Sequence, residues 1–230
     1  MESSELKVFE EMSKKNYKRW LVPFVDDLLE RTNFKKGKIL DVACGPGFLV
    51  KELANRSKLF ELVGIDYSKY AVRQAKKNCK QFRNTSFKVA SVYQIPFSDN
   101  YFDALVSKDS LHHFDNLKMA LVEMLRVLKP GGVLYAQDLR RDLPWYLLKR
   151  SIPQDSMIKK LQFYSARASY TKEEVKKIFF QLEIDKLNVK TRKMTKRLKI
   201  KYTREGIDPG EVKESFQSRY VIMANKMRHV

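Results

Sequence analysis

Two hydrophobic periods alternate along the chain. Short apolar runs of strand length are separated by segments in which apolar residues return every three or four positions, as on one face of a helix. Predicted strands cover residues 38–43, 59–66, 85–92, 103–108, 133–139 and 219–226, and predicted helices cover 48–57, 68–82, 117–129 and 171–182. Alternating strands and helices are typical of an α/β fold with a parallel sheet, and we expect that fold here.

The two ends of the chain depart from this alternation. Residues 3–31 carry apolar side chains at helical spacing, and we expect Pro23 to break them into two helices. Residues 187–202 alternate in places, and "RLKIKY" within them has the period of a strand. We therefore expect the last strands to form a hairpin. Residues 1–230 are predicted to form one domain, with residues 1–36 as an N-terminal helical cap.

The charge of the chain leaves two interpretations open. Lysine and arginine number 46 against 27 acidic residues, which gives a net charge of +19. Such a charge favours a polyanionic partner such as RNA, but lysines spread along the whole chain are also typical of a lysine-rich proteome. Residues 186–204 hold nine basic residues and no acid. They could track phosphates, or they could form an edge strand that lysine keeps soluble.

Other features narrow the class of protein. No run of about eighteen apolar residues occurs, so we expect no membrane span. The first residues are polar and acidic without an apolar stretch, unlike a signal peptide. Only two cysteines occur, Cys44 and Cys79, and their spacing fits no zinc site. These features predict a cytoplasmic protein in a reducing compartment.

A glycine-containing loop, "DVACGPG", follows the first predicted strand. In an open α/β sheet, ligands bind outside the carboxyl ends of the strands, and Gly45 and Gly47 would let a ligand approach the backbone. The chain has no G-x-x-x-x-G-K-[ST], and Val50 stands where the last glycine of G-x-G-x-x-G would be, which disfavours a pyrophosphate. "LVGIDYS" places Asp66 at the end of the second strand, where a carboxylate can accept hydrogen bonds from a ribose diol.

These motifs belong to a longer pattern. "KILDVACGPG", "LVGIDYS", "VASVYQIPFSDNYFDALVSKDSLHHF" and "EMLRVLKPGGVLYAQD" follow one another through residues 38–138. With them the chain resembles class I S-adenosylmethionine-dependent methyltransferases, particularly the ubiquinone and menaquinone biosynthesis group. The resemblance implies an α/β, Rossmann-like sheet of seven strands, mostly parallel, with helices on both faces and the last strand antiparallel. It also implies S-adenosyl-L-methionine as the cofactor.

The resemblance assigns roles to single residues. The implied cofactor-binding residues are Asp41, Ala43, Gly45 and Gly47 for the amino acid moiety, Asp66 for the ribose, Tyr67, Ser91 and Val92 for the adenine, and Ser107 and Lys108 near the transferred methyl group. Ser91 stands where the family often has an acid, so its hydroxyl and the Val92 N–H would make that contact instead. An acid at Asp41 would attract the ammonium and sulfonium of this cofactor and would repel a pyrophosphate.

Three residues are candidates for the chemistry. Methyl transfer from a sulfonium is an in-line displacement, in which the protein mainly aligns and desolvates the acceptor, and a general base is needed only where the acceptor loses a proton. His112 and Asp109 are candidates for that base, and Arg140 could grip an anionic acceptor. Alternatively, His112 is a packing histidine and Arg140 belongs to a solvated loop beside Asp142. Adjacent histidines point apart and no third ligand is evident, so we expect no metal.

The acceptor stays open between three hypotheses. A small molecule, methylated on oxygen, nitrogen or carbon, is the leading one; the others are RNA, bound by the basic C-terminal region, and a cofactor-binding protein without transfer activity. The chain has no [DN]-P-P-[YFW] run and no pair of catalytic thiols, which disfavours two routes of nucleobase methylation.

Residues 139–170 lie where the resembling enzymes insert acceptor-binding structure and would form a lid, or part of the core. The large apolar residues of this segment are Trp145, Tyr146, Leu147, Leu148, Phe163 and Tyr164.

Overall fold

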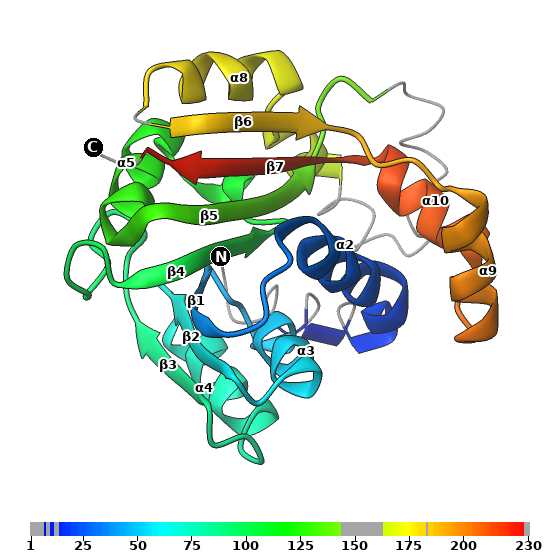
Figure 1. Cartoon of the computed structure of the whole chain (residues 1–230), viewed down its shortest axis with the longest axis horizontal. Helices are drawn as coiled ribbons and strands as arrows, with labels where there is room; N and C mark the ends of the chain where they lie inside the picture. The colour runs from blue at the N-terminus through cyan, green and yellow to red at the C-terminus, as the bar shows by residue number, and fades with distance from the viewer. Residues whose placement is uncertain (1–6, 8–9, 12–13, 144–162, 183, 228–230) are drawn as a thin grey trace.

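The computed structural model of the chain describes all residues except 1–6, 8–9, 12–13, 144–162, 183 and 228–230. Within the described residues, seven strands form one sheet in the order β3-β2-β1-β4-β5-β7-β6 (Figure 1). The strands are β1 (Gly37–Val42), β2 (Phe60–Asp66), β3 (Thr85–Val89), β4 (Phe102–Lys108), β5 (Leu128–Leu139), β6 (Ile184–Lys190) and β7 (Arg219–Lys226). The helices are η1 (Tyr17–Leu21), α2 (Val22–Thr32), α3 (Phe48–Arg56), α4 (Lys69–Asn78), η2 (Leu111–His113), α5 (Leu117–Val127), α8 (Lys172–Phe180), α9 (Lys196–Arg204) and α10 (Pro209–Gln217).

The direction of the strands confirms the predicted fold class. The five strands from β3 to β5 are parallel, and β7 runs antiparallel to its neighbours β5 and β6. The chain passes from β1 outwards to β2 and β3, and then returns to the other side of β1 with β4. Such a reversal leaves a crevice at the carboxyl ends of the strands, and this is where α/β proteins of this kind bind ligands.

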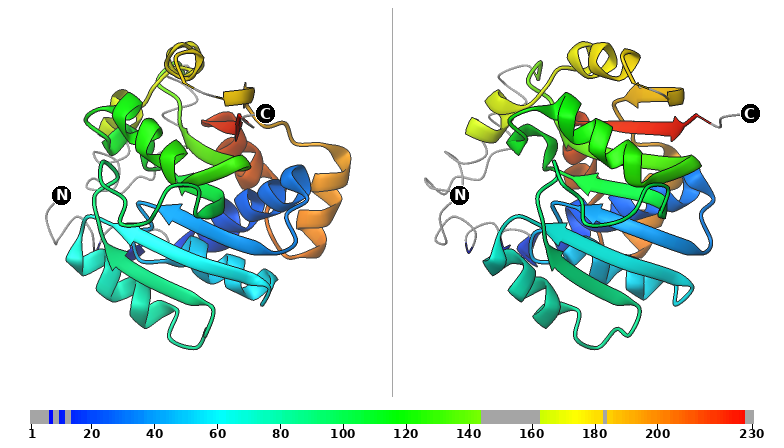
Figure 2. Two further views of the ribbon diagram at one scale, coloured as in Figure 1. Left: turned by 60° about the vertical axis from the view of Figure 1, so that its left-hand side comes forward. Right: turned by 90° about the vertical axis from the view of Figure 1, so that its left-hand side faces the viewer.

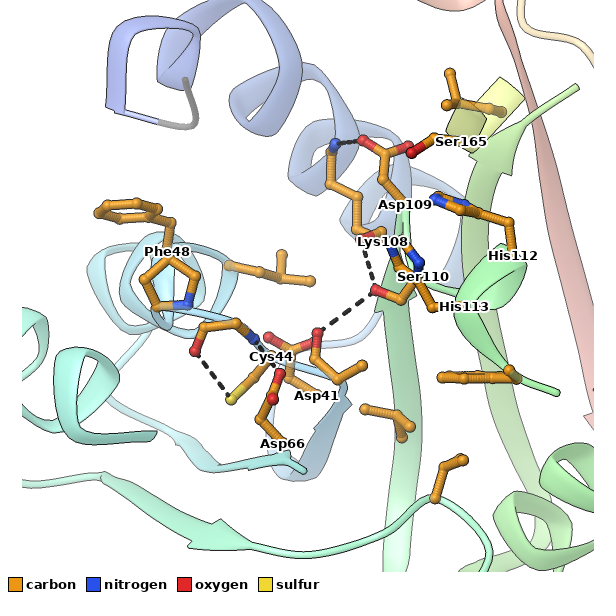
Figure 3. A pocket seen from close by; sticks show the side chains of 18 of the residues that line it. Asp41, Cys44, Phe48, Asp66, Lys108, Asp109, Ser110, His112, His113 and Ser165 are labelled. Atoms are coloured by element: carbon orange, nitrogen blue, oxygen red, sulfur yellow. Dashed lines mark hydrogen bonds and ion pairs between the residues drawn. The ribbon is translucent and has the colours of Figure 1, made fainter. Parts of the chain in front are cut away.

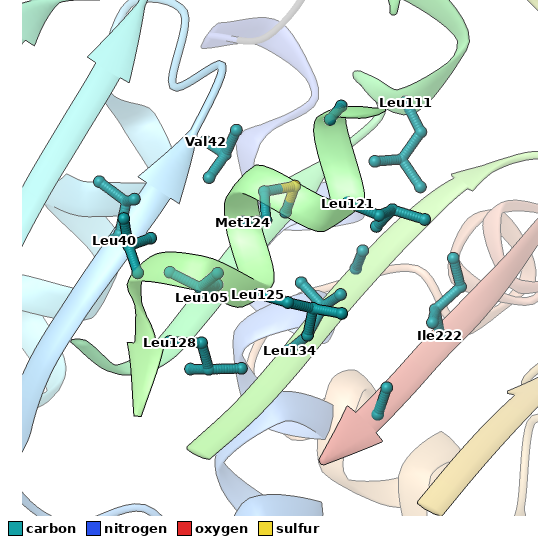
Figure 4. Packing of buried hydrophobic residues seen from close by; sticks show 14 of the residues in the cluster. Leu40, Val42, Leu105, Leu111, Leu121, Met124, Leu125, Leu128, Leu134 and Ile222 are labelled. Atoms are coloured by element: carbon teal, nitrogen blue, oxygen red, sulfur yellow. The ribbon is translucent and has the colours of Figure 1, made fainter. Parts of the chain in front are cut away.

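Helices cover both faces of the sheet because successive strand residues point to opposite sides (Figure 2). On one face, α5 packs against Leu40, Leu105 and Leu134, and α8 joins the same cluster (Figure 4). On the other face, α2, α3 and α4 pack with Ile39 and Val106. Each such side chain contributes roughly 1.5–3 kcal/mol when it is fully buried. The two apolar layers therefore fix the strand ends that carry polar side chains.

The predicted C-terminal hairpin is wrong. β6 and β7 are neighbours in the sheet, but α9 and α10 lie between them in the chain. "RLKIKY", predicted as a strand, belongs to α9, whose N-cap Thr195 accepts a hydrogen bond from the Leu198 N–H at 3.2 Å. Leu198 and Tyr202 stand four residues apart and pack with Phe216 of α10. Burial of this helical face outweighs the strand-like alternation of a six-residue segment, while β6 does lie at the edge of the sheet.

The N-terminal helices and the α9–α10 insertion meet at one end of the sheet (Figure 1). Pro23 lies in the first turn of α2, directly after the π-helical η1, so the helix type changes where the sequence predicted a break. Arg192 donates a hydrogen bond to the Pro23 carbonyl at 2.8 Å, and its Nε lies 3.2 Å from Asp27 Oδ1. Arg19 of η1 forms an ion pair with Glu214 of α10 at 3.2 Å. These contacts hold the two segments together.

Part of the predicted lid and of the predicted N-terminal cap lies outside the described residues. Of residues 139–170 the structure describes 139–143 and 163–170, and Tyr164 is exposed there. None of the helices in the described part of the chain is long and apolar enough to cross a membrane.

Candidate active site

A cavity of about 880 Å³ opens at the carboxyl ends of β1, β2, β3 and β4, beside the reversal of strand order (Figure 3). Its walls come from the segments that follow these strands, from η1, and from the end of α10. Small-molecule sites usually measure about 300–1,000 Å³, so this cavity has room for a sizeable ligand or for two ligands side by side. The predicted site residues that line it are Asp41, Ala43, Gly45, Asp66, Tyr67, Ser91, Val92, Lys108, Asp109 and His112.

Three predicted site residues, Gly47, Ser107 and Arg140, lie outside the cavity lining. Gly47 packs against α4, where an added Cβ would stand 2.8 Å from the Cβ of Ala75. Ser107 is buried and donates its hydroxyl hydrogen to a backbone carbonyl of β1 at 3.1 Å. Arg140 makes two hydrogen bonds of 2.9 Å to the carboxylate of Asp142. The geometry of Arg140 therefore fits the solvated-loop interpretation.

The loop after β1 turns its backbone toward the cavity. Ala43 and Gly45 have φ angles of 58° and 53°, in the left-handed region that a residue with a side chain enters at a cost of about 1–2 kcal/mol. A Cβ added to Gly45 would meet nothing within 4 Å. The N–H of Cys44 donates to the carbonyl of Ile65 at 2.9 Å, which ties the loop to β2. The loop therefore presents open backbone rather than side chains.

The carboxylate of Asp66 is fixed by backbone donors. The N–H of Gly45 donates to Oδ2 at 2.9 Å, and the N–H of Ser68 donates to Oδ1 at 2.8 Å. Burial raises the pKa of Asp66, and these two donors offset part of the rise. Each carboxylate oxygen has a second lone pair, so Asp66 can accept two further hydrogen bonds from a ligand. Its orientation is set before any ligand arrives.

Asp41 is a buried acid without a counter-charge in contact among the residues that the structure describes. Its side chain lines the cavity, the residue is 2% exposed, and Oδ2 has no hydrogen-bond partner in the same part of the chain. Burial, helped by the charge of Asp66, raises the pKa of Asp41 well above its usual value. Unpaired buried polar atoms are rare in proteins, and a bound cation would satisfy this one.

The segment after β3 forms a further wall of the cavity. The Ala90 N–H donates to the Asp66 carbonyl at 3.0 Å, which places Ser91 and Val92 beside the end of β2. The hydroxyl of Ser91 accepts a hydrogen bond from the Tyr93 N–H at 3.1 Å. Tyr67 lies at the rim and is 83% exposed. Ser91, Val92 and Tyr93 therefore form this wall, with Tyr67 at its rim.

Lys108, Asp109 and Arg219 form a charged cluster at the end of β4, in which Arg219 is buried and the other two are half-buried. Lys108 Nζ contacts one carboxylate oxygen of Asp109, and Arg219 Nε donates to the other at 2.7 Å. Burial alone would raise the pKa of Asp109, but the charges of Arg219 and Lys108 hold it below its usual range. Burial lowers the pKa of Lys108, and the charge of Asp109 offsets part of this decrease. Asp109 is therefore held as an anion between two cations. A carboxylate whose pKa is lowered in this way is unsuitable as a general base.

His112 and Asp138 form a hydrogen-bonded pair beside this cluster (Figure 3 labels the histidine). The ring Nδ1 of His112 lies 2.7 Å from Oδ1 of Asp138, and its backbone N–H donates to Oδ2 at 2.9 Å. Burial lowers the pKa of His112, but the charge and hydrogen bond of Asp138, together with the charge of Asp109, outweigh burial and raise it above its usual value. The other ring nitrogen, Nε2, has no hydrogen-bond partner within the described part of the chain. It is therefore available to a ligand in the cavity that His112 lines.

His113 differs from its neighbour in its charge state. The two imidazole rings do not point apart as the sequence predicted: they lie 4.0 Å apart between centroids and are inclined by 48°. Burial, together with the charge of His112, lowers the pKa of His113 to about 4. His113 is therefore neutral at physiological pH and packs beside the pair formed by His112 and Asp138.

Several lining residues had no signal in the sequence. They are Arg19 and Trp20 of η1, Ser215 at the end of α10, Ser218, and Arg219 at the start of β7. They come from opposite ends of the chain, and no short motif connects them. Asp138 was visible as a polar residue near the end of a predicted strand, but its contact with His112, 26 residues away, depends on the pairing of β4 with β5.

Comparisons with known proteins agree with this geometry. The methyltransferase domain family matches residues 33–199. An uncharacterized methyltransferase of Schizosaccharomyces pombe, C1B3.06c, is 32% identical over 112 residues, which are 45% of this chain and 40% of the relative. The ubiquinone/menaquinone biosynthesis C-methyltransferase UbiE of Rickettsia bellii is 31% identical over 137 residues, 56% of this chain and 53% of the relative. The chain thus spans about half the length of these curated relatives.

Solved structures share the fold over nearly the whole chain. The plantazolicin methyltransferase BpumL, solved in complex with a triazolic desmethylPZN analog and SAH, superposes with a TM-score of 0.75. The two chains are 16% identical, and the match covers 99% of this chain and 92% of that one. At this identity the similarity establishes a shared fold.

Proposed function

The chain belongs to the methyltransferase domain family, as a class I S-adenosylmethionine-dependent methyltransferase, and on that premise we propose that it methylates a small molecule. The observation that carries the proposal is the pair of carboxyls at the ends of neighbouring strands on one cavity, the buried Asp41 and the half-buried Asp66. S-adenosylmethionine carries a ribose, an ammonium and an electrophilic methyl group on a positively charged sulfur. Two carboxyls suit this molecule, because both its cations and its sugar hydroxyls are attracted to them.

The residues of the cavity fit this cofactor. Asp66 would accept hydrogen bonds from the ribose hydroxyls with the lone pairs that Gly45 and Ser68 leave unused. Asp41, whose Oδ2 has no partner in the described structure, would hold the ammonium. The open backbone at Gly45 would lie against the amino acid moiety.

The adenine would lie on the wall after β3. Ser91 and Val92 line the cavity there, and the exposed ring of Tyr67 stands at its rim. Ser91 accepts a hydrogen bond from the Tyr93 N–H, and its own hydroxyl hydrogen is available to a ring nitrogen. Tyr67 would cover one face of the base by stacking.

His112 would remove the proton that the acceptor loses. Asp138 holds Nδ1, so in neutral His112 the proton sits on Nδ1 and Nε2 carries the lone pair. Nε2 lacks a partner in the described structure and belongs to a residue of the cavity wall. A base held by a buried carboxylate in this way can accept a proton from an oxygen or nitrogen acceptor, or from an acidic carbon.

The walls of the cavity favour a small acceptor. η1 and the end of α10 both line the cavity, and they are tied together through Arg19. RNA stays the alternative acceptor, and it would use the basic residues of β6 and α9. A cofactor-binding protein without transfer activity is the third hypothesis.

Incubation with methyl-labelled S-adenosylmethionine and cell extract of the source organism tests these alternatives. We expect label in low-molecular-weight metabolites, with a steep loss in the His112→Gln variant, whose cofactor affinity serves as the control. Label in RNA, with binding that weakens steeply as salt rises, would establish the alternative acceptor. Label in no fraction, despite measured binding of the cofactor, would leave a protein that only binds it.

We also propose that the protein works in the reducing cytoplasm. Cys44 and Cys79 are both free and buried, and burial raises the pKa of Cys79 to about 11. Such thiols are poor nucleophiles and contribute as apolar packing. We expect the melting temperature to be the same with and without a reducing agent.

A further inference from the structure

We propose that the methyl acceptor is an organic anion, and that Arg19 and Arg219 bind its carboxylate or phosphate group at the end of the cavity between η1 and α10. This inference rests on the proposed methyl transfer, because it names the class of molecule that receives the methyl group.

The first support for an anionic acceptor comes from buried polar atoms of the cavity residues that make no hydrogen bond. Asp41 Oδ2, His112 Nε2 and Arg19 Nε are buried and make no hydrogen bond in the described structure, and all three residues line the cavity. Buried polar atoms are nearly always paired, so each of these atoms marks the place of a ligand group. Asp41 suits the ammonium of the cofactor, and His112 suits a proton of the acceptor. Arg19 Nε is a donor on a permanent cation, and an anionic acceptor atom is its best partner.

Arg219 presents a second donor to the same end of the cavity. The residue is 7% exposed, and its Nε donates to Asp109 at 2.7 Å. Its Nη1 donates to the hydroxyls of Ser218 at 3.1 Å and Ser215 at 3.4 Å. These contacts leave Nη2 without a hydrogen bond to any residue that the structure describes. Because three contacts fix the guanidinium, its remaining N–H groups are held ready for a carboxylate or phosphate oxygen.

The charge balance also favours an anion. Lys108 and Arg219 share the single carboxylate of Asp109, and each of its oxygens is already engaged by one of them. Within the described residues, Arg19 pairs only with Glu211 and Glu214, whose side chains are 49% and 38% exposed and therefore screened by water.

Among the described residues, the other buried acid of this region, Asp138, makes no hydrogen bond or ion pair with Arg19 or Arg219. Asp138 is not part of the cavity wall, and it accepts hydrogen bonds from His112 and from the Leu139 N–H. Buried positive charge without full compensation is costly, and an anionic ligand would relieve it.

The neighbouring wall is apolar. The Arg219 guanidinium lies 5.3 Å from the ring centroid of Trp20, and Trp20, Leu21 and Leu139 line the cavity with it. A ring beside the Arg219 guanidinium can contact the carbon skeleton of a ligand whose anionic group pairs with the arginines. The acceptor therefore combines an anionic group with an apolar body.

The test separates acceptors by charge before the reaction. Low-molecular-weight metabolites are divided by ion exchange into anionic, neutral and cationic pools, and each pool is incubated with the protein and methyl-labelled S-adenosylmethionine. We expect the anionic pool to support labelling. Prior treatment with phosphatase distinguishes the sources, since activity that survives marks a carboxylate and activity that is lost marks a phosphate ester.

Variants connect the anion to the two arginines. Arg19→Gln and Arg219→Gln should each raise the amount of anionic pool needed for half-maximal labelling by roughly tenfold or more, because each removes charged hydrogen bonds. Affinity for SAH, measured by calorimetry, should be unchanged, and Arg219→Lys keeps the charge if the glutamine variant fails to fold. Arg197→Gln on the exposed side of α9 removes one positive charge outside the cavity and is the matched control.

The outcomes distinguish this inference from the function on which it rests. Labelling confined to the neutral or cationic pool would overturn the anionic acceptor and leave methyl transfer to small molecules intact. The same would follow if Arg19→Gln, and a folded Arg219→Gln, labelled the anionic pool as Arg197→Gln does. Binding of SAH without labelling of any pool would overturn the proposed function itself.

Discussion

Asp138 holds His112 at two points, through the ring Nδ1 at 2.7 Å and through the backbone N–H at 2.9 Å. The carboxylate therefore sets both the position of the residue and the orientation of its imidazole. A base that is oriented in this way contributes typically about 10²–10⁴-fold to a reaction that includes proton transfer.

We expect His112→Gln to lower the rate of methyl transfer by about 10²–10⁴-fold, because the amide of glutamine cannot accept a proton near neutral pH. Affinity for SAH, measured by calorimetry, should stay the same, since Asp41 and Asp66 follow other strands. A rate within a factor of two or so of the parent would show that the acceptor loses no proton to His112.

The pH dependence of the Asp138→Asn variant tests the role of the carboxylate. Burial lowers the pKa of His112 and the charge of Asp138 raises it, with a net rise above 6.5. A base must be neutral to accept a proton, so the rate should increase as pH rises through this pKa. Removal of the Asp138 charge should move that increase to lower pH and reduce the plateau. An unchanged pH profile in initial-rate measurements would assign Asp138 a purely structural role.

The Asp66→Asn variant should bind the cofactor more weakly by about 1–3 kcal/mol, the usual value of lost hydrogen bonds to a charged group. The amide keeps the size of the side chain but cannot accept at both positions where Gly45 and Ser68 donate. Calorimetric titration with S-adenosylmethionine measures the change. Equal affinity in the two proteins would contradict the assignment of the ribose to Asp66.

The Asp41→Asn variant should have opposite effects on the stability of the fold and on the affinity for the cofactor. Burial raises the pKa of Asp41, so the folded state holds this proton more tightly than the unfolded state. The stability that this group contributes is therefore full below its unfolded pKa and is lost as pH rises through the folded pKa. Above that point the Asp41→Asn variant should be more stable than the parent by about 1–2 kcal/mol in urea unfolding, while it binds the cofactor less tightly. A loss of stability at alkaline pH would show that the ionised carboxylate has a stabilising partner.

Two glycines of one loop should respond differently to the same change. Gly47→Ala places a Cβ 2.8 Å from the Cβ of Ala75 at a φ of 78°, so it should cost about 2–4 kcal/mol of stability. Gly45→Ala meets no neighbour within 4 Å and should cost only about 1–2 kcal/mol from its φ of 53°. Its methyl group should instead weaken cofactor binding. Urea unfolding and calorimetry measure the two effects, and equal stability losses would refute the packing role of Gly47.

The half of the chain that forms β1 to β5 could be predicted because its signals are local. Asp41 and Asp66 each follow directly from a buried strand and its turn, and the ends of neighbouring parallel strands must meet. Val50, which stands in place of the last glycine of G-x-G-x-x-G, also indicated that this loop is not a pyrophosphate site. Here the order of the elements along the chain is enough to bring the cofactor residues together.

The acceptor side could not be predicted because its contacts are distant in sequence. Arg19 and Glu214 meet across 195 positions, and Arg219 and Asp109 across 110. In the sequence, Arg140 stands among the same kinds of residues as an arginine of a binding site. In the structure, its guanidinium is paired with the carboxylate of Asp142, two residues away. Whether a charged side chain faces a cavity depends on packing that a short motif does not encode.

The position of β7 between β5 and β6 bears on how the protein is made. β6 leaves the ribosome before β7, yet it joins the sheet only through β7. The nascent chain must therefore carry β6 with both edges unpaired until the last strand has been synthesised. We expect Lys186 and Lys190 on β6 to hinder its premature association with a neighbouring nascent chain.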